Sequence, residues 1–436
     1  MRHFLIFSVA LLLAFPAWSQ TFTENKKNEH IVVVDDESCG CELVFIDGIQ
    51  TTQRDSLFGF KHEDGRVLVE PKYKFVDQFQ NGFCRVLTDY YQYGLIDTSG
   101  SEIIPCIWED LLLPTEGMVR VQKNGLYGFV GLNGNPSIPP LYRAASNFVE
   151  ELAVVIFDFD SFYSAYGYIN KNNQFVLPPR YEYAYPFQQG YAVVKQYDRY
   201  GIIDRSGKEI VPIKYQVITS VDSNHLFLIY DTDVEKFAMF RIKGDSYTRI
   251  TDFVYDDFIA YSEGYYVFKK GDKQGFINKE GKECFGLYDM VDQFRDGFSM
   301  VRQGNHYGIL NERGSLVVPC IFDYPDDAHD PYVFHEGLAM VIQNGRYGFV
   351  NTQGQIAIPI QYQKAFPFAD DRAPVLVNGY WGYINSSNQL VIPNVFNAAS
   401  PFEYHRAEVV YNSEVFKIFP DGKCAKNCKH FPVLIF

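Results

Sequence analysis

The sequence predicts an all-β fold, a tandem array of about ten repeats of about 35 residues, each a three-stranded antiparallel meander. Close variants of one segment, residues 347–362 (YGFVNTQGQIAIPIQY), recur along the chain, and a Gly or Asn turn residue returns every 33 to 40 residues. Tyr and Phe raise the aromatic content to 17%, which suits pleated surfaces carrying large rings. We expect an open, curved array, with a propeller-like ring as the alternative, because rings usually hold about four to eight blades.

The turn of each repeat is the most regular feature, because its final residue needs positive φ and is therefore Gly or Asn. These turn residues are Gly65, Gly100, Gly134, Asn173, Gly207, Gly244, Gly281, Gly314, Gly354, Asn388 and Gly422. An Asp or Asn usually stands three residues earlier, as Asn351 does, where its side chain is expected to accept backbone N–H bonds across the turn.

Strand signals flank each turn. An aromatic-Gly pair such as Tyr347-Gly348 ends six residues before the turn residue, and a glycine inside a strand marks close approach by a neighbour. We expect a ring from an adjacent strand or repeat to lie across it. A Pro such as Pro359 follows the turn by five residues, with an aromatic three residues further on. Because Pro has no N–H to donate, we expect the ladder to stop there or to reach a sheet edge.

A further strand is expected between these hairpins, where an aromatic or His and a polar residue lead to Gly and alternating apolar residues. It begins at Phe79 (FQNGFCRV), Phe187 (FQQGYAVV), Phe294 (FRDGFSMV) and His335 (HEGLAMV). The alternation predicts a half-buried strand. The link that precedes it is expected to add a fourth short strand or to pack as a loop.

Taken together, these elements from about Leu57 to Gly422 resemble the WG (KWG) repeat family. The resemblance implies bacterial tandem β repeats, often exported, with no general catalytic activity and no catalytic residues to transfer. Most repeats carry Tyr or Phe where the family name has Trp, and Trp381-Gly382 is the one literal match. The stretch from Tyr215 to Phe276 departs most from the pattern.

The chain divides into four parts. Residues 1–19 read as a signal peptide cleaved before Gln20, without a cysteine there for a lipid anchor. Residues 20–56 form an N-terminal segment with two short apolar runs that can cap the array, residues 57–421 form the array, and residues 422–436 form a tail whose FPVLIF run can add a closing strand. No other apolar run is long enough to span a bilayer, so the mature protein is expected to be soluble, and periplasmic or secreted.

The eight cysteines of an exported chain invite a disulfide interpretation. The candidates lie outside the core repeats, in Cys39-Gly-Cys41 and between Cys424 and Cys428, with the pairing left open. Four others occupy strand positions and are expected to be structural, either free or bridging repeats: Cys84, Cys106, Cys284 and Cys320.

Two insertions are the candidate ligand sites. The loop 323–336 (DYPDDAHDPYVFHE) crowds carboxylates and imidazoles that could bind a divalent cation, although a solvated polar loop is the simpler interpretation. Its candidate ligands are Asp326, Asp327, His329, Asp330, His335 and Glu336. The segment 157–164 (FDFDSFYS) mixes acids and rings, which suits either a sugar-binding surface or edge packing.

Composition and motifs narrow the function. A formal net charge of −14 disfavours nucleic acid and anionic lipid as partners. The sequence contains no Ser/His/Asp set, His-Glu-x-x-His, phosphate-binding loop or dinucleotide fingerprint in the required context. We therefore predict an exported, non-catalytic binding or scaffold protein that engages a protein or an envelope glycan, without cofactor or metal. The alternative is a carbohydrate-active enzyme or a glycan-binding accessory module.

Overall fold

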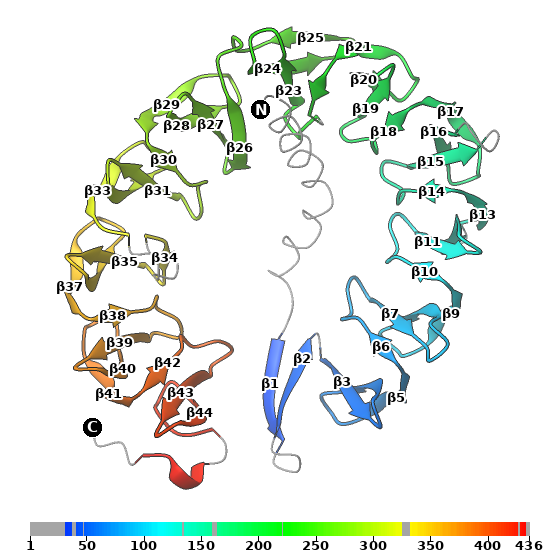
Figure 1. The fold of residues 1–436 in the computed structure, drawn as a ribbon. Coiled ribbons are helices and arrows are strands. Elements are labelled where there is room, and N and C mark those ends of the chain that lie inside the picture. Colours follow the sequence, from blue (N-terminus) through cyan, green and yellow to red (C-terminus); the bar gives the residue numbers. More distant parts are fainter. Residues whose placement is uncertain are drawn as a thin grey trace, which may run out of the picture. The chain divides into compact units, whose positions relative to one another are not determined.

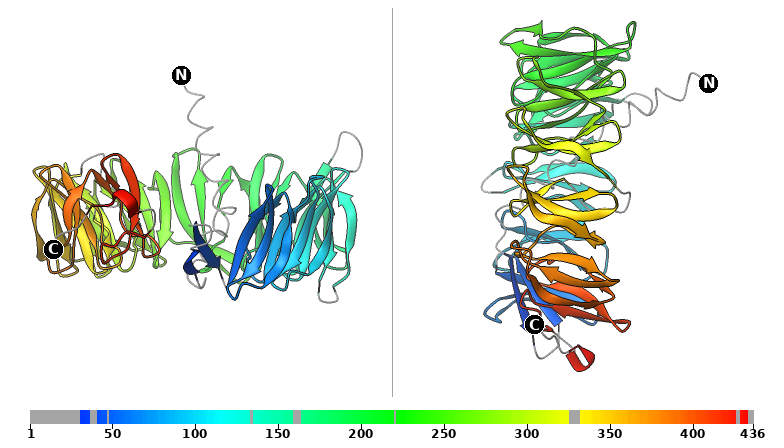
Figure 2. Two further views of the ribbon diagram at one scale, coloured as in Figure 1. Left: turned by 90° about the horizontal axis from the view of Figure 1, so that it is seen from below. Right: turned by 90° about the vertical axis from the view of Figure 1, so that its left-hand side faces the viewer.

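The computed structural model describes residues 31–36, 41–46, 48–132, 135–158, 164–219, 221–324, 332–425 and 428–432. For residues 31–36, 41–46, 164 and 428 this description covers the backbone only. The chain forms two compact units (Figures 1 and 2), one of residues 1–234 and 238–249 and one of residues 235–237 and 250–436. Within the described residues no helix is long and apolar enough to cross a membrane.

The first unit is a series of antiparallel sheets that follow the chain in order. Its sheets are β1 (Ile31–Asp36), β2 (Cys41–Ile46), β3 (Ile49–Arg54), β4 (Leu57–His62) and β5 (Val67–Tyr73); β6 (Phe75–Val76), β7 (Phe83–Leu87), β8 (Tyr93–Asp97) and β9 (Glu102–Trp108); β10 (Asp110–Leu111), β11 (Met118–Lys123), β12 (Leu126–Gly131) and β13 (Ile138–Tyr142); β14 (Ala144–Ala145), β15 (Leu152–Asp158), β16 (Ser164–Asn170) and β17 (Phe175–Tyr181); β18 (Tyr183–Ala184), β19 (Tyr191–Gln196), β20 (Arg199–Asp204) and β21 (Glu209–Tyr215); and β22 (Val217–Ile218), β23 (Leu226–Asp231), β24 (Lys236–Lys243) and β25 (Ser246–Arg249).

The second unit continues the same plan. Its sheets are β26 (Asp257–Ser262), β27 (Tyr265–Lys270), β28 (Lys273–Asn278) and β29 (Glu283–Tyr288); β30 (Met290–Val291), β31 (Phe298–Gln303), β32 (His306–Asn311) and β33 (Leu316–Phe322); β34 (Phe334–His335), β35 (Leu338–Gln343), β36 (Arg346–Asn351) and β37 (Ile356–Tyr362); β38 (Lys364–Ala365), β39 (Ala373–Val377), β40 (Tyr380–Ile384) and β41 (Leu390–Phe396); and β42 (Ala398–Ala399), β43 (Ala407–Tyr411) and β44 (Glu414–Ile418), followed by a short 3-10 helix at Cys428–His430.

The all-β tandem repeat is therefore confirmed, and most sheets have four strands rather than three. The first strand of most sheets is two residues long and comes from the link between repeats, which was expected to form either a short strand or a loop. Figure 1 shows successive sheets following one another along each unit. Whether the whole array is open or closed stays a prediction.

The structure corrects our expectation about the aromatic-Gly pair. Across β36 and β37, Tyr347 pairs with Tyr362 but Phe349 pairs with Ile358, so the fourth strand bulges opposite Gly348. A Cβ on Gly348 would lie 2.8 Å from Ile358 O and 2.7 Å from Ile360 Cα. Backbone, not an aromatic ring, thus closes on most of these glycines.

The bulge also explains the proline, which lies on the outer strand of its sheet, as one of our two expectations had it, but does not end that strand. Pro359 lies within β37, and the strand continues to Tyr362 instead of ending. Because the bulged residues lie outside the regular ladder, a missing N–H at this point costs no hydrogen bond. The sequence pattern Pro-x-x-aromatic therefore marks a bulge followed by renewed pairing.

The turns behave alike along the chain. Every described turn residue has positive φ, including Asn173 and Asn388, while Gly134 lies outside the described residues. At Asn351, Oδ1 accepts hydrogen bonds from the backbone N–H groups of Gln353 and Gln355 at 3.1 and 3.0 Å. The same pair of bonds recurs at Asp97, Asn170, Asp204, Asn278, Asn311 and Asn385.

The core lies between consecutive sheets. The residue after the aromatic-Gly pair is often aromatic, and it packs on a Phe that lies shortly before the second strand of the next sheet. The ring centroids of Tyr168 and Phe187 lie 4.8 Å apart, and those of Phe349 and Phe368 lie 5.0 Å apart. Burying one such ring stabilises the fold by about 1.5–3 kcal/mol, so each repeat depends on its neighbour.

Both ends of the array differ from its middle. β1 and β2 extend the first sheet to five strands, while the last sheet has three. There Phe431 packs against Phe396 and Phe416, with ring centroids 6.0 and 5.3 Å apart. The expected closing strand falls mostly on residues 433–436, which lie outside the described residues.

Candidate functional site

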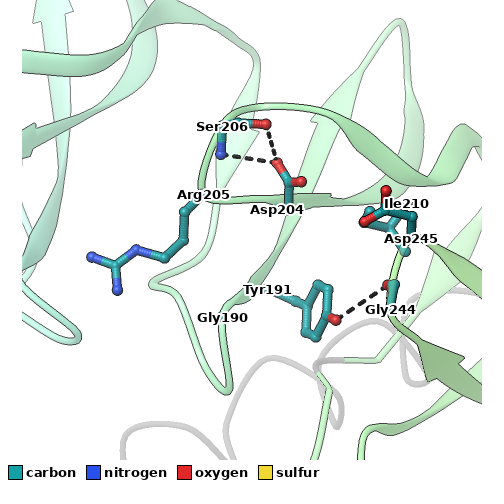
Figure 3. Close-up of a pocket in the computed structure, with 8 residues that line it drawn as sticks. All are labelled: Gly190, Tyr191, Asp204, Arg205, Ser206, Ile210, Gly244 and Asp245. Carbon is teal, nitrogen blue, oxygen red and sulfur yellow. Dashed lines mark hydrogen bonds between the residues drawn. The ribbon is translucent and has the colours of Figure 1, made fainter.

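A shallow, open pocket of about 310 Å³ lies within the first unit, between one end of the sheet β18–β21 and the hairpin β24–β25 (Figure 3). Its lining consists of Gly190, Tyr191, Asp204, Arg205, Ser206, Ile210, Gly244 and Asp245. The repeat turn of β20 and β21 supplies three of these side chains, so the pocket is built from turn residues and not from a special insertion.

Most polar groups that line this pocket already form hydrogen bonds or ion pairs within the chain. The Asp204 carboxylate accepts hydrogen bonds from Ser206 Oγ at 2.6 Å and from the backbone N–H groups of Ser206 and Lys208. Partial burial acts to raise the pKa of Asp204, but these hydrogen bonds outweigh it and hold the pKa below its ordinary value. Asp204 is therefore a stabilised carboxylate and a poor general base.

The remaining lining groups tie neighbouring repeats together. The Tyr191 hydroxyl donates to Gly244 O at 3.3 Å, and Lys208 Nζ lies 2.6 Å from Asp245 Oδ2. Arg205 donates to Glu150 O at 2.6 Å. The pocket can hold a small polar molecule, but within the described residues it contains no nucleophile paired with an imidazole or a free carboxylate base.

Acids in the tight turn just before the second strand of a sheet act as links to the next repeat. Glu150 Oε2 accepts the backbone N–H of Gly190 at 2.9 Å, and Glu116 Oε2 accepts that of Glu151 at 2.8 Å. Glu263 and Glu336 do the same in the second unit, toward Gly297 N and Asp371 N. Charge-assisted hydrogen bonds of this kind are among the stronger ones.

Sequence reasoning missed a second set of hydrogen-bond acceptors, which lie at the opposite end of the sheets. The residue after the Pro-x-x-aromatic element is often Glu, Asp, Gln or Asn, and its side chain accepts backbone N–H groups of the hairpin between the second and third strands. Glu109 accepts from Asn124 and Gly125, at 2.9 and 3.0 Å. The other such acceptors are Glu182, Asp256, Asp289, Asp323, Gln363 and Asn397. Their recurrence at one position of the repeat is the sequence signal that could have identified them.

The predicted cation loop is only partly described. Asp326, Asp327, His329 and Asp330 lie outside the described residues. Glu336 forms the inter-repeat link above, and His335 ends β34 with its Nε2 buried and unpartnered. Within the described part of the chain, no three His, Cys, Asp or Glu side chains are grouped to hold a metal.

The second insertion lengthens one hairpin. β15 and β16 pair out to Asp158 and Ser164, and residues 159–163 lie outside the described residues. Phe157 packs on Phe175 with ring centroids 6.0 Å apart, so this part of the insertion is in ring contact with its own sheet.

The described strand cysteines are free thiols: Cys84, Cys106, Cys284 and Cys320. Burial, assisted by the nearby Asp77 carboxylate, raises the pKa of the Cys84 thiol to about 12, which makes it a poor nucleophile. Cys424 is disulfide-bonded, while the side chains of Cys39, Cys41 and Cys428 lie outside the described residues. The pairing of the terminal cysteines stays a prediction.

The solved structures that match this chain share little of its sequence and superpose on it only loosely. BamB from Moraxella catarrhalis is 9% identical, with a TM-score of 0.29 over 78% of this chain and 94% of that one. Apo AztD from Citrobacter koseri is 14% identical, with a TM-score of 0.25 over 64% and 92%. The extracellular domain of the hybrid two component system BT3049 from B. thetaiotaomicron is 12% identical, with a TM-score of 0.23 over 80% and 64%. No curated protein matches the sequence.

A family profile described as "WG containing repeat" matches most of the chain. The matched residues are 58–91, 93–127, 127–158, 166–200, 200–227, 250–273, 275–306, 307–347, 347–381 and 381–413. Residues 228–249 are unmatched and fall within the stretch whose sequence departs most from the pattern. With the matches falling on the observed sheets, the chain belongs to the WG containing repeat family.

Proposed function

We propose that this chain is an exported, non-catalytic binding or scaffold protein whose repeat surface engages a protein or a glycan of the bacterial envelope. Export is proposed from the signal-peptide pattern of residues 1–19. Tandem repeats that contact mainly their neighbours form extended recognition surfaces, which supports a binding role.

The observation that carries the proposal is the use of the repeat carboxylates. Glu150, Glu182 and Asp204 each accept backbone N–H groups, so their oxygens hold turns and repeats in place. A general acid or base at neutral pH usually needs a carboxyl group whose pKa is raised. Hydrogen bonding has the opposite effect at Asp204, and also at Asp97, where the Ser99 hydroxyl lowers the pKa.

One described carboxyl group, that of Asp257, favours the enzymatic alternative. Burial of its carboxyl raises the pKa of Asp257, although the residue as a whole is exposed, while the neighbouring Asp256 has a lowered pKa because hydrogen bonds from Lys236 and Gly271 outweigh its burial. The Asp256 carboxylate is held by Lys236 and the Gly271 N–H, and Asp257 Oδ1 accepts the N–H of Phe258, so both groups are engaged in local contacts rather than arranged as a glycosidase pair. The pair therefore gives little support to hydrolysis.

The test uses the mature chain, residues 20–436, immobilised and exposed to a solubilised bacterial envelope and to envelope polysaccharides. We expect specific retention of a protein or glycan that is recovered chemically unchanged. Release of new reducing ends that disappears in the Asp257→Asn variant would instead establish the carbohydrate-active enzyme. The binding role is refuted if the immobilised chain retains neither a protein nor a glycan at ionic strengths near the physiological value.

A further inference from the structure

Four tyrosines gather at one end of the sheets β14–β17 and β18–β21, within the first unit. Tyr166 lies on β16, Tyr183 on β18, Tyr185 just after β18, and Tyr200 on β20. The Tyr166 and Tyr183 ring centroids lie 4.9 Å apart at 45°, and those of Tyr183 and Tyr185 lie 4.9 Å apart at 65°. We call these four residues the tyrosine quartet.

The phenol groups of the quartet converge. Burial raises the pKa of Tyr185 to about 12, and the nearby phenols of Tyr183, Tyr200 and Tyr166 contribute to the increase. Tyr183 is the most accessible member at 40% exposure, and the other three are half-buried. The quartet therefore presents several hydroxyls together with exposed ring surface.

None of these four hydroxyls makes a hydrogen bond to any residue that the structure describes, and none is among the described buried polar atoms lacking a partner. They are thus open to solvent. Tyrosines elsewhere differ: Tyr168 donates to Tyr185 O at 2.7 Å, and Tyr383 donates to Ser400 O at 2.9 Å. The fold satisfies those phenols internally but leaves the hydroxyls of the quartet available.

Equivalent positions in one other repeat also carry four tyrosines, Tyr307, Tyr324, Tyr332 and Tyr347, but there Tyr332 and Tyr347 are buried and the Tyr332 hydroxyl donates to Asp323 O. In the sheet β38–β41, Phe366 stacks on Trp381 with ring centroids 5.1 Å apart, and neither ring carries a hydroxyl. One repeat before the quartet, Ala144 and Ser146 occupy the positions of Tyr183 and Tyr185. The repeat therefore packs without these tyrosines, and none of the four residues of the quartet is buried.

The charges around the quartet are paired. Lys195 Nζ lies 2.6 Å from Asp198 Oδ1 and 4.0 Å from Glu182 Oε2, and Arg143 lies 3.8 Å from Asp158. An anionic ligand therefore finds no free cation among these side chains. A neutral ligand with both apolar faces and many hydroxyls suits the quartet better.

We propose that the tyrosine quartet is a binding site for a neutral glycan, with pyranose C–H faces on the rings and sugar hydroxyls bonded to the phenols. Aromatic rings with a few placed polar groups are the usual composition of small-ligand sites. A peptide strand would need a longer open edge than the two residues of β18 provide. This proposal rests on the proposed binding function and names its ligand class.

The test is calorimetric titration of the mature chain with maltohexaose, cellohexaose and hexa-N-acetylchitohexaose, and with decaproline as the peptide probe. We expect at least one oligosaccharide to bind and decaproline not to bind. Tyr183→Ala should weaken oligosaccharide binding about tenfold or more, and Tyr185→Phe, which removes only a hydroxyl, about threefold to tenfold. Tyr197→Ala is the control, since Tyr197 is 82% exposed on the neighbouring hairpin and lies outside the quartet. This variant should bind the oligosaccharides as tightly as the unchanged chain does.

If Tyr183→Ala unfolds, Tyr183→Phe replaces it in the test. This variant keeps the ring and loses only the hydroxyl, so it should also bind the oligosaccharide more weakly than the unchanged chain. The proposal is overturned if no oligosaccharide binds, if decaproline binds at the quartet instead, or if the quartet variants bind as tightly as the Tyr197→Ala control. Retention of an envelope protein by the same preparation would then leave the general binding function standing. Loss of both kinds of binding would remove the binding function as well.

Discussion

The hydrogen bond between Tyr362 and Asn388 offers the sharpest test of how consecutive repeats are coupled. The Tyr362 hydroxyl donates to Asn388 Oδ1 at 2.5 Å, from one repeat to the turn residue of the next. Tyr142 and Asn173 form the same bond at 2.6 Å in the first unit. Both turn asparagines that replace glycine therefore face a tyrosine, and we infer that the bond compensates for their positive φ.

The size of the effect follows from two opposing terms. A neutral hydrogen bond of this kind contributes about 1 kcal/mol, so Tyr362→Phe should lower the free energy of unfolding by about that amount. In Asn388→Gly, relief of the left-handed conformation, about 1 kcal/mol, should offset the lost bond. In the Tyr362→Phe background no bond remains to lose, so the same Asn388→Gly change should stabilise the chain by about 1 kcal/mol. Phe322 followed by Gly354 is a natural example of the double variant.

The assay is urea unfolding of the mature chain in a Trp108→Phe background, so that Trp381 fluorescence reports the second unit alone. The coupling energy from the four variants should be about 1 kcal/mol, and it does not require the two units to unfold together. A coupling energy indistinguishable from zero, or an Asn388→Gly effect of the same size in both backgrounds, would refute the compensation.

Three further outcomes are expected. Gly348→Ala should lower the free energy of unfolding by about 3 kcal/mol, because the added Cβ meets backbone atoms of the next strand. Gly345→Ala, where the Cβ enters open space at a φ of 69°, should lower it by only about 1 kcal/mol. Equal urea midpoints for the two variants would contradict the bulge argument. Glu150→Ala should speed hydrogen exchange at the Gly190 amide while Glu150→Gln restores much of its protection, and unchanged exchange in both variants would exclude the link. Because the Cys84 pKa rises from 9.0 to about 12 on folding, the folded state binds this proton more tightly; the resulting stabilisation is complete below about pH 9 and is lost as the pH approaches 12. Cys84→Ala should therefore lose less stability than wild type between about pH 8 and 10, and parallel losses would contradict this assignment.

Much of the repeat could be predicted from its sequence, because local chemistry determines it. The left-handed turn residue and the Asp or Asn before it act within a few residues of chain, so Asn351 and Gly354 reveal their roles by spacing alone. The strand after Phe187 was predicted from its apolar residues, although three consecutive residues, Ala192 to Val194, are buried instead of every second one.

The features that sequence reasoning missed depend on pairing between strands or repeats. The bulge opposite Gly348 arises from register, which no local pattern encodes, and so the proline appeared to end a strand. The link between Glu150 and Gly190 joins residues 40 positions apart, so a single repeat shows only an acid beside a turn. The tyrosine quartet likewise draws on two sheets, although the alternating tyrosines of 181–185 (YEYAY) were a usable signal.

The most direct test of a scaffold that binds without chemistry is mass spectrometry of an oligosaccharide mixture after long incubation with the mature chain. The account predicts that every oligosaccharide keeps its mass while a subset is retained by wild type and lost from the Tyr183→Ala variant. The appearance of shortened or transferred sugars, dependent on a carboxylate of this chain, would contradict it.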